Sequence, residues 1–356
     1  MTIERPTRRE PPTLEAVAAE AGVSRSTVSR VVNGSSHVSP DVVQTVTAAI
    51  DRLGYIPNRA ARSLANRRTM AIALVVPEEA QRFFGDPFFS EVMQGIITVI
   101  EGSDYVLNLQ LAKPDAPSSK TIRYLLGGNV DGAIVVSHHS GDEFFTRLDA
   151  TIPVVFGGRP FRPGADADAA AAIGVTDDSA PDNNYVDVDN AAGAAMGTRH
   201  LLGLGRRTLA TIAGPSNMQA AVDRRDGWAS ALTEAGLDAS LVAYGDFTMA
   251  GGAAAMRELL DREPDIDGVF VASDLMATGA ISVLRSRGRR VPEDVAVVGF
   301  DDSSAATNGE VGITTVHQPS RQMGTEMARM LLDLLDEQPT ERARVLPTKL
   351  VIRESA

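Results

Sequence analysis

Hydrophobic residues near the start of the chain recur every three to four positions and predict a run of short helices. In the first of these helices, Leu14, Val17, Ala18 and Ala21 fall at i, i+3, i+4 and i+7. Thr13 stands directly before this run, where a hydroxyl can cap the first free backbone N–H groups. The pattern therefore predicts an amphipathic helix with one apolar face.

A second predicted helix follows after a tight turn. Gly22 can take the positive φ that such a turn needs, and Ser24 can cap the helix. The predicted buried side carries Val28, Val31 and Val32, and the other side carries Arg25, Ser26, Ser29 and Arg30. Asn33-Gly34 ends the pattern, so this helix is short and its outer face is polar and basic.

A third helix is expected from Ser39 as cap and Pro40 as first residue, with its inner face formed by Val43, Val46, Ile50 and Leu53. Two helices joined by a turn of about three or four residues can place the second helix in the DNA major groove. Apolar spacing alone fits any three-helix cluster. The short arginine-bearing second helix is what favours DNA as the partner.

The segment after this unit has two interpretations. Pro57 can open a helix, and 58–65 is rich in alanine with Arg59 and Arg62 on one face. A helix this short is unstable in water, so it would fold only on DNA. Alternatively, the segment is an interdomain linker, with Leu64 packed on the domain that follows.

Beyond residue 69 the pattern changes to strands that alternate with helices. The strand-like runs are Met70–Val76, Tyr105–Leu111, Gly132–Val136, Pro153–Phe156, Leu209–Ala213, a run ending at Phe247, Gly268–Ala272, Val295–Gly299 and Ile313–Val316. Helical stretches such as Asn190–Leu204 and Asp274–Gly288 separate them. This alternation predicts doubly wound α/β folding with parallel sheets. The length of this part favours two similar lobes.

Composition narrows the function classes. The net charge is −12, yet residues 1–70 hold ten arginines against six acidic residues. These residues therefore carry a net charge of about +4, and the rest of the chain carries about −16. The chain has no cysteine, no signal-peptide pattern at its start and no membrane-length apolar run. Its five histidines lack metal-ligand spacing, and neither a P-loop nor a complete GxGxxG is present, so we expect no cofactor, no metal and no enzyme.

Ligands of open parallel sheets bind at the carboxyl ends of the strands. Applied to this sequence, the rule predicts these ligand contacts: Asp86, Phe89, Arg159, Arg224, Phe247, Ser273, Asp274, Asp301 and Gln318. Carboxylates, guanidinium groups and amides can bind vicinal hydroxyls, and aromatic rings can stack on a sugar. Two choices stay open: Asp274 could instead cap the next helix, and either Phe88 or Phe89 could face the ligand, with Phe89 preferred.

The N-terminal stretch closely resembles the lac-repressor family (LacI/GalR-type regulators). The residues that carry the resemblance are Thr13-Leu14, Val17-Ala18, Ala21–Ser24, Thr27–Asn33, Val38-Ser39 and Gly54–Asn58, and a looser match continues to the end of the chain. The resemblance implies a helix-turn-helix DNA-binding domain followed by a two-lobed, periplasmic-binding-protein-like effector domain. Arg224, Phe247, Asp301 and Gln318 are the clearest matches to the family's effector contacts.

The resemblance also implies a domain plan. We expect a DNA-binding domain at 1–57, a hinge at 58–68, and an effector and dimerisation domain at 69–356. The expected N-lobe is about 69–158 plus 319–338, and the C-lobe about 159–318 plus 339–356. The implied DNA contacts are Thr13, Ser24, Arg25, Ser26, Thr27, Ser29, Arg30, Asn33, His37, Tyr55, Asn58, Arg59, Arg62 and Leu64, with Leu64 as a minor-groove wedge.

As a member of this family, the protein would be a cytoplasmic, nucleoid-associated homodimer that represses from a near-palindromic operator and is released by a sugar. The runs FGGRP, TIAGP, YGDFT and VASDLMA resemble repressors that respond to cellobiose or related oligosaccharides. Corepression by a purine-type ligand and activation are the alternatives. Two departures from the family stand out: Gly157-Gly158 replaces an acidic residue, and the insert Gly164–Asn183 is longer than usual.

Overall fold

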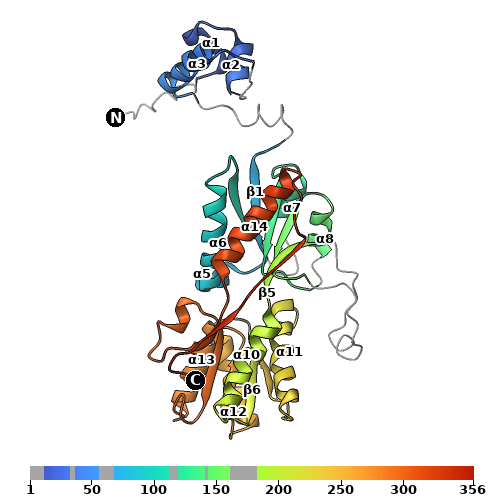
Figure 1. Ribbon diagram of the computed structural model, residues 1–356, viewed down its shortest axis with the longest axis vertical. Helices are drawn as coiled ribbons and strands as arrows, with labels where there is room; N and C mark the ends of the chain where they lie inside the picture. The colour runs from blue at the N-terminus through green and yellow to red at the C-terminus, as the bar shows by residue number, and fades with distance from the viewer. Residues whose placement is uncertain (1–11, 33–36, 56–67, 113–118, 141–142, 161–182) are drawn as a thin grey trace, which may run out of the picture. The chain divides into compact units, whose positions relative to one another are not determined.

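The computed structural model describes residues 12–32, 37–55, 68–112, 119–140, 143–160 and 183–356 (Figure 1). Contacts divide the chain into two compact units, Met1–Met70 and Ala71–Ala356, and each is described by itself. No helix among these residues is long and apolar enough to cross a membrane.

The described residues of the first unit form helices α1 (Leu14–Ala21), α2 (Arg25–Val32) and α3 (Pro40–Leu53). The Thr13 hydroxyl accepts from the Ala16 N–H at 3.3 Å, and Gly22 ends α1 with φ 64°. The Ser24 hydroxyl accepts from the Thr27 N–H at 3.1 Å. Ser39 precedes α3 without a side-chain cap bond. The predicted helix-turn-helix is confirmed, with two of its three expected caps.

The core of this unit differs from the prediction on α3. Its buried residues are Val17, Ala18, Val28, Val46, Ala49 and Tyr55, with Ile50 and Leu53 partly buried. Val43 is 37% exposed, so its assignment to the inner face was wrong. The face that packs on α1 and α2 runs through Val42, Val46, Ala49 and Leu53, a spacing of four, three and four residues that leaves Val43 on its margin.

The second unit contains two six-stranded sheets, which define its lobes. The N-lobe sheet has the order β11 (Ala343–Leu346), β5 (Asn184–Val188), β4 (Val154–Gly157), β3 (Gly132–Val136), β1 (Ala71–Val76), β2 (Val106–Leu111). The C-lobe sheet has the order β12 (Lys349–Val351), β10 (Thr314–His317), β9 (Ala296–Asp301), β8 (Gly268–Val271), β6 (Leu209–Ala213), β7 (Val242–Tyr244). All neighbouring strands are parallel except β12, which pairs antiparallel with β10.

Helices cover both faces of each sheet (Figure 1). In the N-lobe, α6 (Pro87–Ile100) and α14 (Ser320–Leu335) pack together on one face, and α7 (Ser119–Leu126) and α8 (Glu143–Asp149) cover the other. In the C-lobe, α10 (Asn190–Gly203) pairs with α11 (Gln219–Glu234), and α12 (Met249–Arg262) pairs with α13 (Asp274–Ser286) on the opposite face. The short helices α5 (Ala80–Gly85) and η1 (Ser304–Ala306) lie in loops after β1 and β9. This arrangement confirms the doubly wound α/β prediction.

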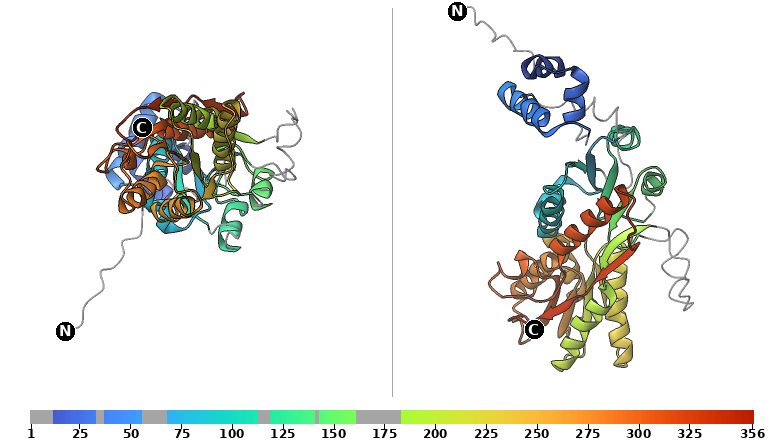
Figure 2. Two further views of the ribbon diagram at one scale, coloured as in Figure 1. Left: turned by 90° about the horizontal axis from the view of Figure 1, so that it is seen from below. Right: turned by 45° about the horizontal axis from the view of Figure 1, so that its top comes forward.

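In the part of the second unit that the structure describes, the chain crosses between the lobes three times: after β5, after β10 and between β11 and β12. Figures 1 and 2 show the last crossing as an extended segment that runs from one lobe to the other. Strands β5 and β11 thus belong to the N-lobe sheet, whereas the expected boundaries place both in the C-lobe. Both strands are partly exposed and polar, so neither gives the continuous apolar signal of a central parallel strand.

Candidate functional site

Helix α2 presents the polar face that the sequence predicts. Arg25, Ser26 and Arg30 are exposed, while Ser29 is half-buried. Arg25 Nε lies 2.9 Å from Glu15 Oε1, and both side chains are largely exposed. An exposed pair of this kind contributes at most about 1 kcal/mol, so the guanidinium can exchange its partner for a phosphate or a base edge.

The remaining predicted DNA contacts fall into three groups. Ser24, Thr13 and His37 are exposed, and Thr27 is half-buried beside Ser24 with its hydroxyl 2.9 Å from the Ser24 hydroxyl. Tyr55 is only 7% exposed, because Gly54 ends α3 in the left-handed conformation and returns the chain to the core. Tyr55 therefore packs in the core of the first unit, a role that its prediction as a DNA contact did not include. Outside the described residues lie Asn33, Asn58, Arg59, Arg62 and Leu64, together with 164–182 of the insert.

A cleft between the two lobes gathers most of the predicted ligand contacts. Its lining consists of Arg82, Asp86, Phe88, Phe89, Ser137, Gly157, Gly158, Asp187, Met218, Ala220, Arg224, Phe247, Asp301, Gln318 and Met323, around a cavity of about 80 Å³. The predicted residues among them are Asp86, Phe89, Arg224, Phe247, Asp301 and Gln318. The carboxyl ends of β1, β3 and β4 face those of β6 and β9 here, which explains why residues so far apart in sequence meet.

Arg224 of α11 is the central cation of the cleft. It is 5% exposed, and its guanidinium donates to Asn190 Oδ1 at 2.8 Å, Ala272 O at 2.7 Å, Gln318 Oε1 at 2.7 Å and Asp301 Oδ1 at 3.3 Å. Its Cζ stands 3.6 Å from the centre of the Phe300 ring. Burial lowers the pKa of Arg224, against the opposing effect of Asp301. The Arg224 side chain therefore connects α11 to α10, to the carboxyl ends of β8 and β9, and to the segment that crosses between the lobes after β10.

Three carboxyl groups around Arg224 have raised pKa values. Burial raises the pKa of Asp301 well above its usual range despite Arg224, and Asp274 and Asp86 raise it further. Burial also raises the pKa of Asp187, although the N–H groups of Arg159 and Val188 donate to it. The pKa of Asp86 is raised by burial, while the Phe88 N–H bond opposes the shift. The carboxyl oxygens of these three residues give the cleft several hydrogen-bond acceptors.

Three predicted ligand contacts lie elsewhere among the described residues. Ser273 caps α13, accepting from the Met276 N–H at 3.3 Å. Asp274 is fully buried, and its two oxygens accept from Thr315 Oγ1 at 2.6 Å and from the Ser303 N–H at 2.8 Å. Neither residue lines the cleft. The alternative that Asp274 caps α13 is wrong, because Ser273 is the N-cap of that helix. Arg159 pairs with Asp223 of α11 at 2.8 Å, beside the cleft and not in its lining.

Aromatic rings contribute from both lobes. Phe88 and Phe89 both line the cleft, with Phe89 buried and Phe88 half-buried, so the preference for Phe89 over Phe88 stays a prediction. Phe247 does not end a strand; it lies in the loop after β7 with φ 63°. Gly214 makes room for that ring, since a Cβ at residue 214 would stand 2.3 Å from it. Positive φ at a phenylalanine is costly and typical of functional sites.

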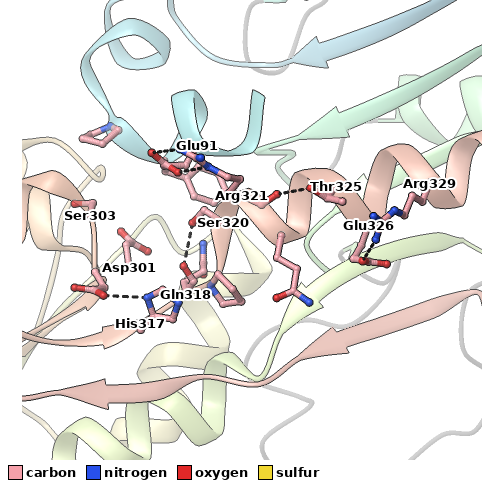
Figure 3. A pocket seen from close by; sticks show the side chains of 15 residues that line it. Glu91, Asp301, Ser303, His317, Gln318, Ser320, Arg321, Thr325, Glu326 and Arg329 are labelled. Carbon is pink, nitrogen blue, oxygen red and sulfur yellow. Dashed lines mark hydrogen bonds and ion pairs between the residues drawn. The ribbon is translucent and has the colours of Figure 1, made fainter. Parts of the chain in front are cut away.

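A larger and more open pocket of about 600 Å³ adjoins the cleft and shares Phe88, Asp301 and Gln318 with it (Figure 3). Its charged side chains pair with one another: Arg321 with Glu91 at 3.0 Å, and Arg329 with Glu326 at 3.0 Å. Most of its lining comes from α14 and the crossing before it. The cleft is the better candidate site, because it gathers six of the predicted ligand contacts, whereas the larger pocket contains only Asp301 and Gln318 of them.

Sequence reasoning missed several lining residues, above all Arg82 and Asp187. Asp187 lies in β5, a strand that the pattern did not reveal, and Arg82 lies in the short helix α5. The carboxyl-end rule could have found Asp187 once β5 was recognised. Among the described residues, no group of three or more histidine, aspartate or glutamate side chains has a geometry that could hold a metal ion.

Comparison with known proteins agrees with this architecture. The family model for bacterial regulatory proteins of the lacI family matches residues 13–58, and a periplasmic binding protein-like domain matches residues 198–356. The HTH-type transcriptional regulator CelR of Thermobifida fusca is 47% identical over 352 residues, covering 98% of this chain and 99% of that protein. The ribose operon repressor of Halalkalibacterium halodurans is 32% identical over 347 residues, covering 96% of both chains.

Solved structures show the same relationship. A transcriptional regulator CelR–cellobiose complex matches with a TM-score of 0.74 at 46% identity, covering 97% of this chain and all of that one. A lac repressor dimer bound to operator and the anti-inducer ONPF matches with a TM-score of 0.82 at 28% identity, covering 97% and 99%. These full-length relatives are regulators and not enzymes. The chain therefore belongs to the LacI family of bacterial regulatory proteins and is a DNA-binding transcriptional regulator.

Proposed function

We propose that this regulator is a homodimeric repressor that binds a near-palindromic operator and is released from it by cellobiose or a related β-linked oligosaccharide. The observation that carries this proposal is the cleft, which brings six predicted ligand contacts from two lobes to one place. The match to a CelR–cellobiose complex supports the choice of sugar.

The chemistry of the cleft favours a neutral ligand with many hydroxyl groups. Asp86, Asp187 and Asp301 offer carboxyl oxygens that accept from hydroxyl donors, and Phe88 and Phe247 offer faces for a sugar ring. An anionic ligand would add charge beside carboxyl groups whose raised pKa values already reflect costly ionisation. A sugar satisfies these acceptors without adding charge.

The size of the cleft links sugar binding to movement of the lobes. A cavity of about 80 Å³ is small beside the roughly 300–1,000 Å³ of ligand pockets. We propose that the lining side chains move and the lobes shift to admit a disaccharide. A ligand changes such an equilibrium only by binding the two arrangements with different affinity, and operator and sugar must then weaken each other by the same factor.

On the DNA side, we propose that α2 reads the major groove through Arg25, Ser26, Ser29 and Arg30. Two copies are needed to read a near-palindrome, and the operator-bound lac repressor dimer supports that assembly. The hinge at 58–68 would fold on DNA, with Leu64 entering the minor groove. Such a repressor would act in the cytoplasm, at the nucleoid.

A thermal-shift screen of the full chain tests the effector assignment. Ligand that binds the native state raises the midpoint of unfolding by mass action. We expect cellobiose to raise it and a panel of monosaccharides to raise it less. A shift with a purine base and none with any sugar would replace the proposed effector class.

A further inference from the structure

A hydrogen-bond network of buried and half-buried residues joins the two lobes beside the cleft. Glu78, after β1, is 5% exposed, and its Oε1 accepts from the Ser137 hydroxyl at 2.7 Å. The same oxygen lies 3.2 Å from His139 Nε2. His139 Nδ1 lies 3.1 Å from Oδ1 of Asn217, a residue of the loop between β6 and α11. The Ser140 N–H donates to the Asn217 carbonyl at 2.7 Å. We call these five residues the interlobe clasp.

The imidazole of His139 sits between two oxygen acceptors, one from each lobe. A neutral ring has one N–H and satisfies one of them, whereas the protonated ring donates to both. Burial lowers the pKa of His139, but the bonds to Glu78 and Asn217 outweigh burial and raise it overall, against repulsion from Arg82. Burial raises the pKa of Glu78, and His139, Arg82 and Ser137 together reverse that shift and lower it. Both shifts have the direction expected of two groups that stabilise each other's charged form.

Arg82 connects this clasp to the cleft. One of its guanidinium nitrogens forms an ion pair with Glu78, and its Cζ lies 5.1 Å from the centre of the Phe247 ring in the opposite lobe. Its Nε is buried without a hydrogen-bond partner among the described residues. A buried donor without a partner is uncommon and calls for an explanation. Arg82 thus covers the aromatic face on which a sugar would stack.

The backbone supports the same arrangement. Ser137 has φ 66°, a left-handed conformation that is strained for serine and brings its hydroxyl to Glu78. His138, the neighbour of His139, is buried, and its Nε2 lies 3.2 Å from Gly158 O; burial lowers its pKa to about 4. The lowered pKa of His138 favours its neutral form, whereas the raised pKa of His139 favours protonation.

We propose that the interlobe clasp holds the sugar-free arrangement of the lobes, and that sugar opens it by displacing Arg82 from Phe247 and so withdrawing Glu78 from His139. This inference rests on the proposed function for the identity of the sugar. It assigns Arg82 the role of an internal competitor for the ligand, and Glu78, His139 and Asn217 the role of positioning residues. None of these three lines the cleft.

Asn217→Ala gives the sharpest test, because it removes one bond of the clasp at a distance from the ligand. Measured by isothermal titration calorimetry on the full chain, cellobiose should bind Asn217→Ala roughly 3- to 10-fold more tightly than wild type, since one hydrogen bond no longer opposes binding. Asn308→Ala, in an exposed loop of the same lobe, is the matched control and should bind as wild type does. Unchanged or weaker binding by Asn217→Ala overturns the clasp, since a purely structural residue would not raise affinity.

A double-mutant cycle tests the link through Arg82. When Arg82→Ala has removed the competitor, the sugar no longer has to disturb Glu78, so adding Asn217→Ala should have little further effect. Independent sites would instead give effects that multiply. A full Asn217→Ala effect in the Arg82→Ala background overturns the Arg82 link.

A sugar-free measurement separates failure of the clasp from failure of the proposed effector. Hydrogen exchange at the Ser140 amide should be at least 3-fold faster in Glu78→Gln than in wild type, and unchanged in the control Glu79→Gln, whose side chain is exposed. If wild type does not bind cellobiose, the effector assignment fails and this exchange alone decides the clasp. Equal protection in Glu78→Gln and wild type overturns it.

Discussion

Replacing Arg224 by alanine removes the cation that organises the cleft. Four acceptors lose their donor: Asn190 Oδ1, the Ala272 carbonyl, Asp301 Oδ1 and Gln318 Oε1. The site is buried, so water cannot replace these bonds without opening the structure. The change therefore affects both the stability of the second unit and its ability to bind a sugar.

The expected magnitude follows from the buried pair with Asp301. Removing one partner of a buried ion pair costs about 3–5 kcal/mol, a large part of the roughly 5–15 kcal/mol that stabilises a domain. Because burial raises the pKa of Asp301, the orphaned carboxyl can be neutralised by a proton. Protonation of Asp301 in Arg224→Ala becomes more complete as pH falls and reduces the cost of the unpaired charge. The free energy of unfolding that Arg224→Ala loses relative to wild type should therefore be larger at about pH 8 than at about pH 5.5.

Urea denaturation of the full chain, with and without cellobiose, measures this loss. Arg225→Ala is the matched control, because Arg225 bonds to the exposed Asp226 and should cost less than about 1 kcal/mol. Arg224→Ala should also lose the sugar response while still binding operator, since the first unit has its own core. Equal stabilities for Arg224→Ala and Arg225→Ala would refute the role of Arg224 in organising the cleft.

Three further predictions concern pH, DNA and packing. Wild-type affinity for cellobiose should rise as pH increases through the raised pKa of His139, because loss of its proton weakens the clasp. Calorimetry should find a smaller pH dependence in Asn217→Ala, which keeps the His139–Glu78 contact but loses the bond to Asn217; a dependence as large as that of wild type would contradict this prediction. Arg30→Ala should weaken specific operator binding, measured by fluorescence anisotropy, by about 1–3 kcal/mol and should leave the circular dichroism spectrum unchanged. A smaller loss of affinity would show that Arg30 does not contact the operator bases. Gly214→Ala places a Cβ 2.3 Å from the Phe247 ring and should abolish cellobiose binding while sparing operator affinity; normal binding in a thermal-shift assay would show that the ring is not needed.

The sequence predicted the elements whose signals are local and strong. Central strands such as β1 are continuous apolar runs, since both faces are covered by helices. The helix-turn-helix followed from spacing and caps, as at Thr13 and Ser24. Six ligand contacts followed from the rule that parallel sheets expose their functional residues at the carboxyl ends of strands.

What the sequence could not reveal depends on contacts between distant segments. Ser273 and Asp274 follow β8 as the rule demands, yet one caps α13 and the other binds Thr315 and Ser303. His139 gave no signal of its own, because its partners lie about sixty and eighty residues away in the chain. Strand β5 pairs between β4 and β11 although only three of its five residues are buried. Tertiary packing decides such positions, and local pattern does not.

The affinity of the full chain for its operator, measured with and without saturating cellobiose, tests the central claim most directly. A typical allosteric coupling of about 1–3 kcal/mol predicts that the sugar weakens operator binding by roughly 5- to 150-fold, and that operator weakens sugar binding by the same factor. Operator binding that is unchanged or tighter with cellobiose would contradict the account.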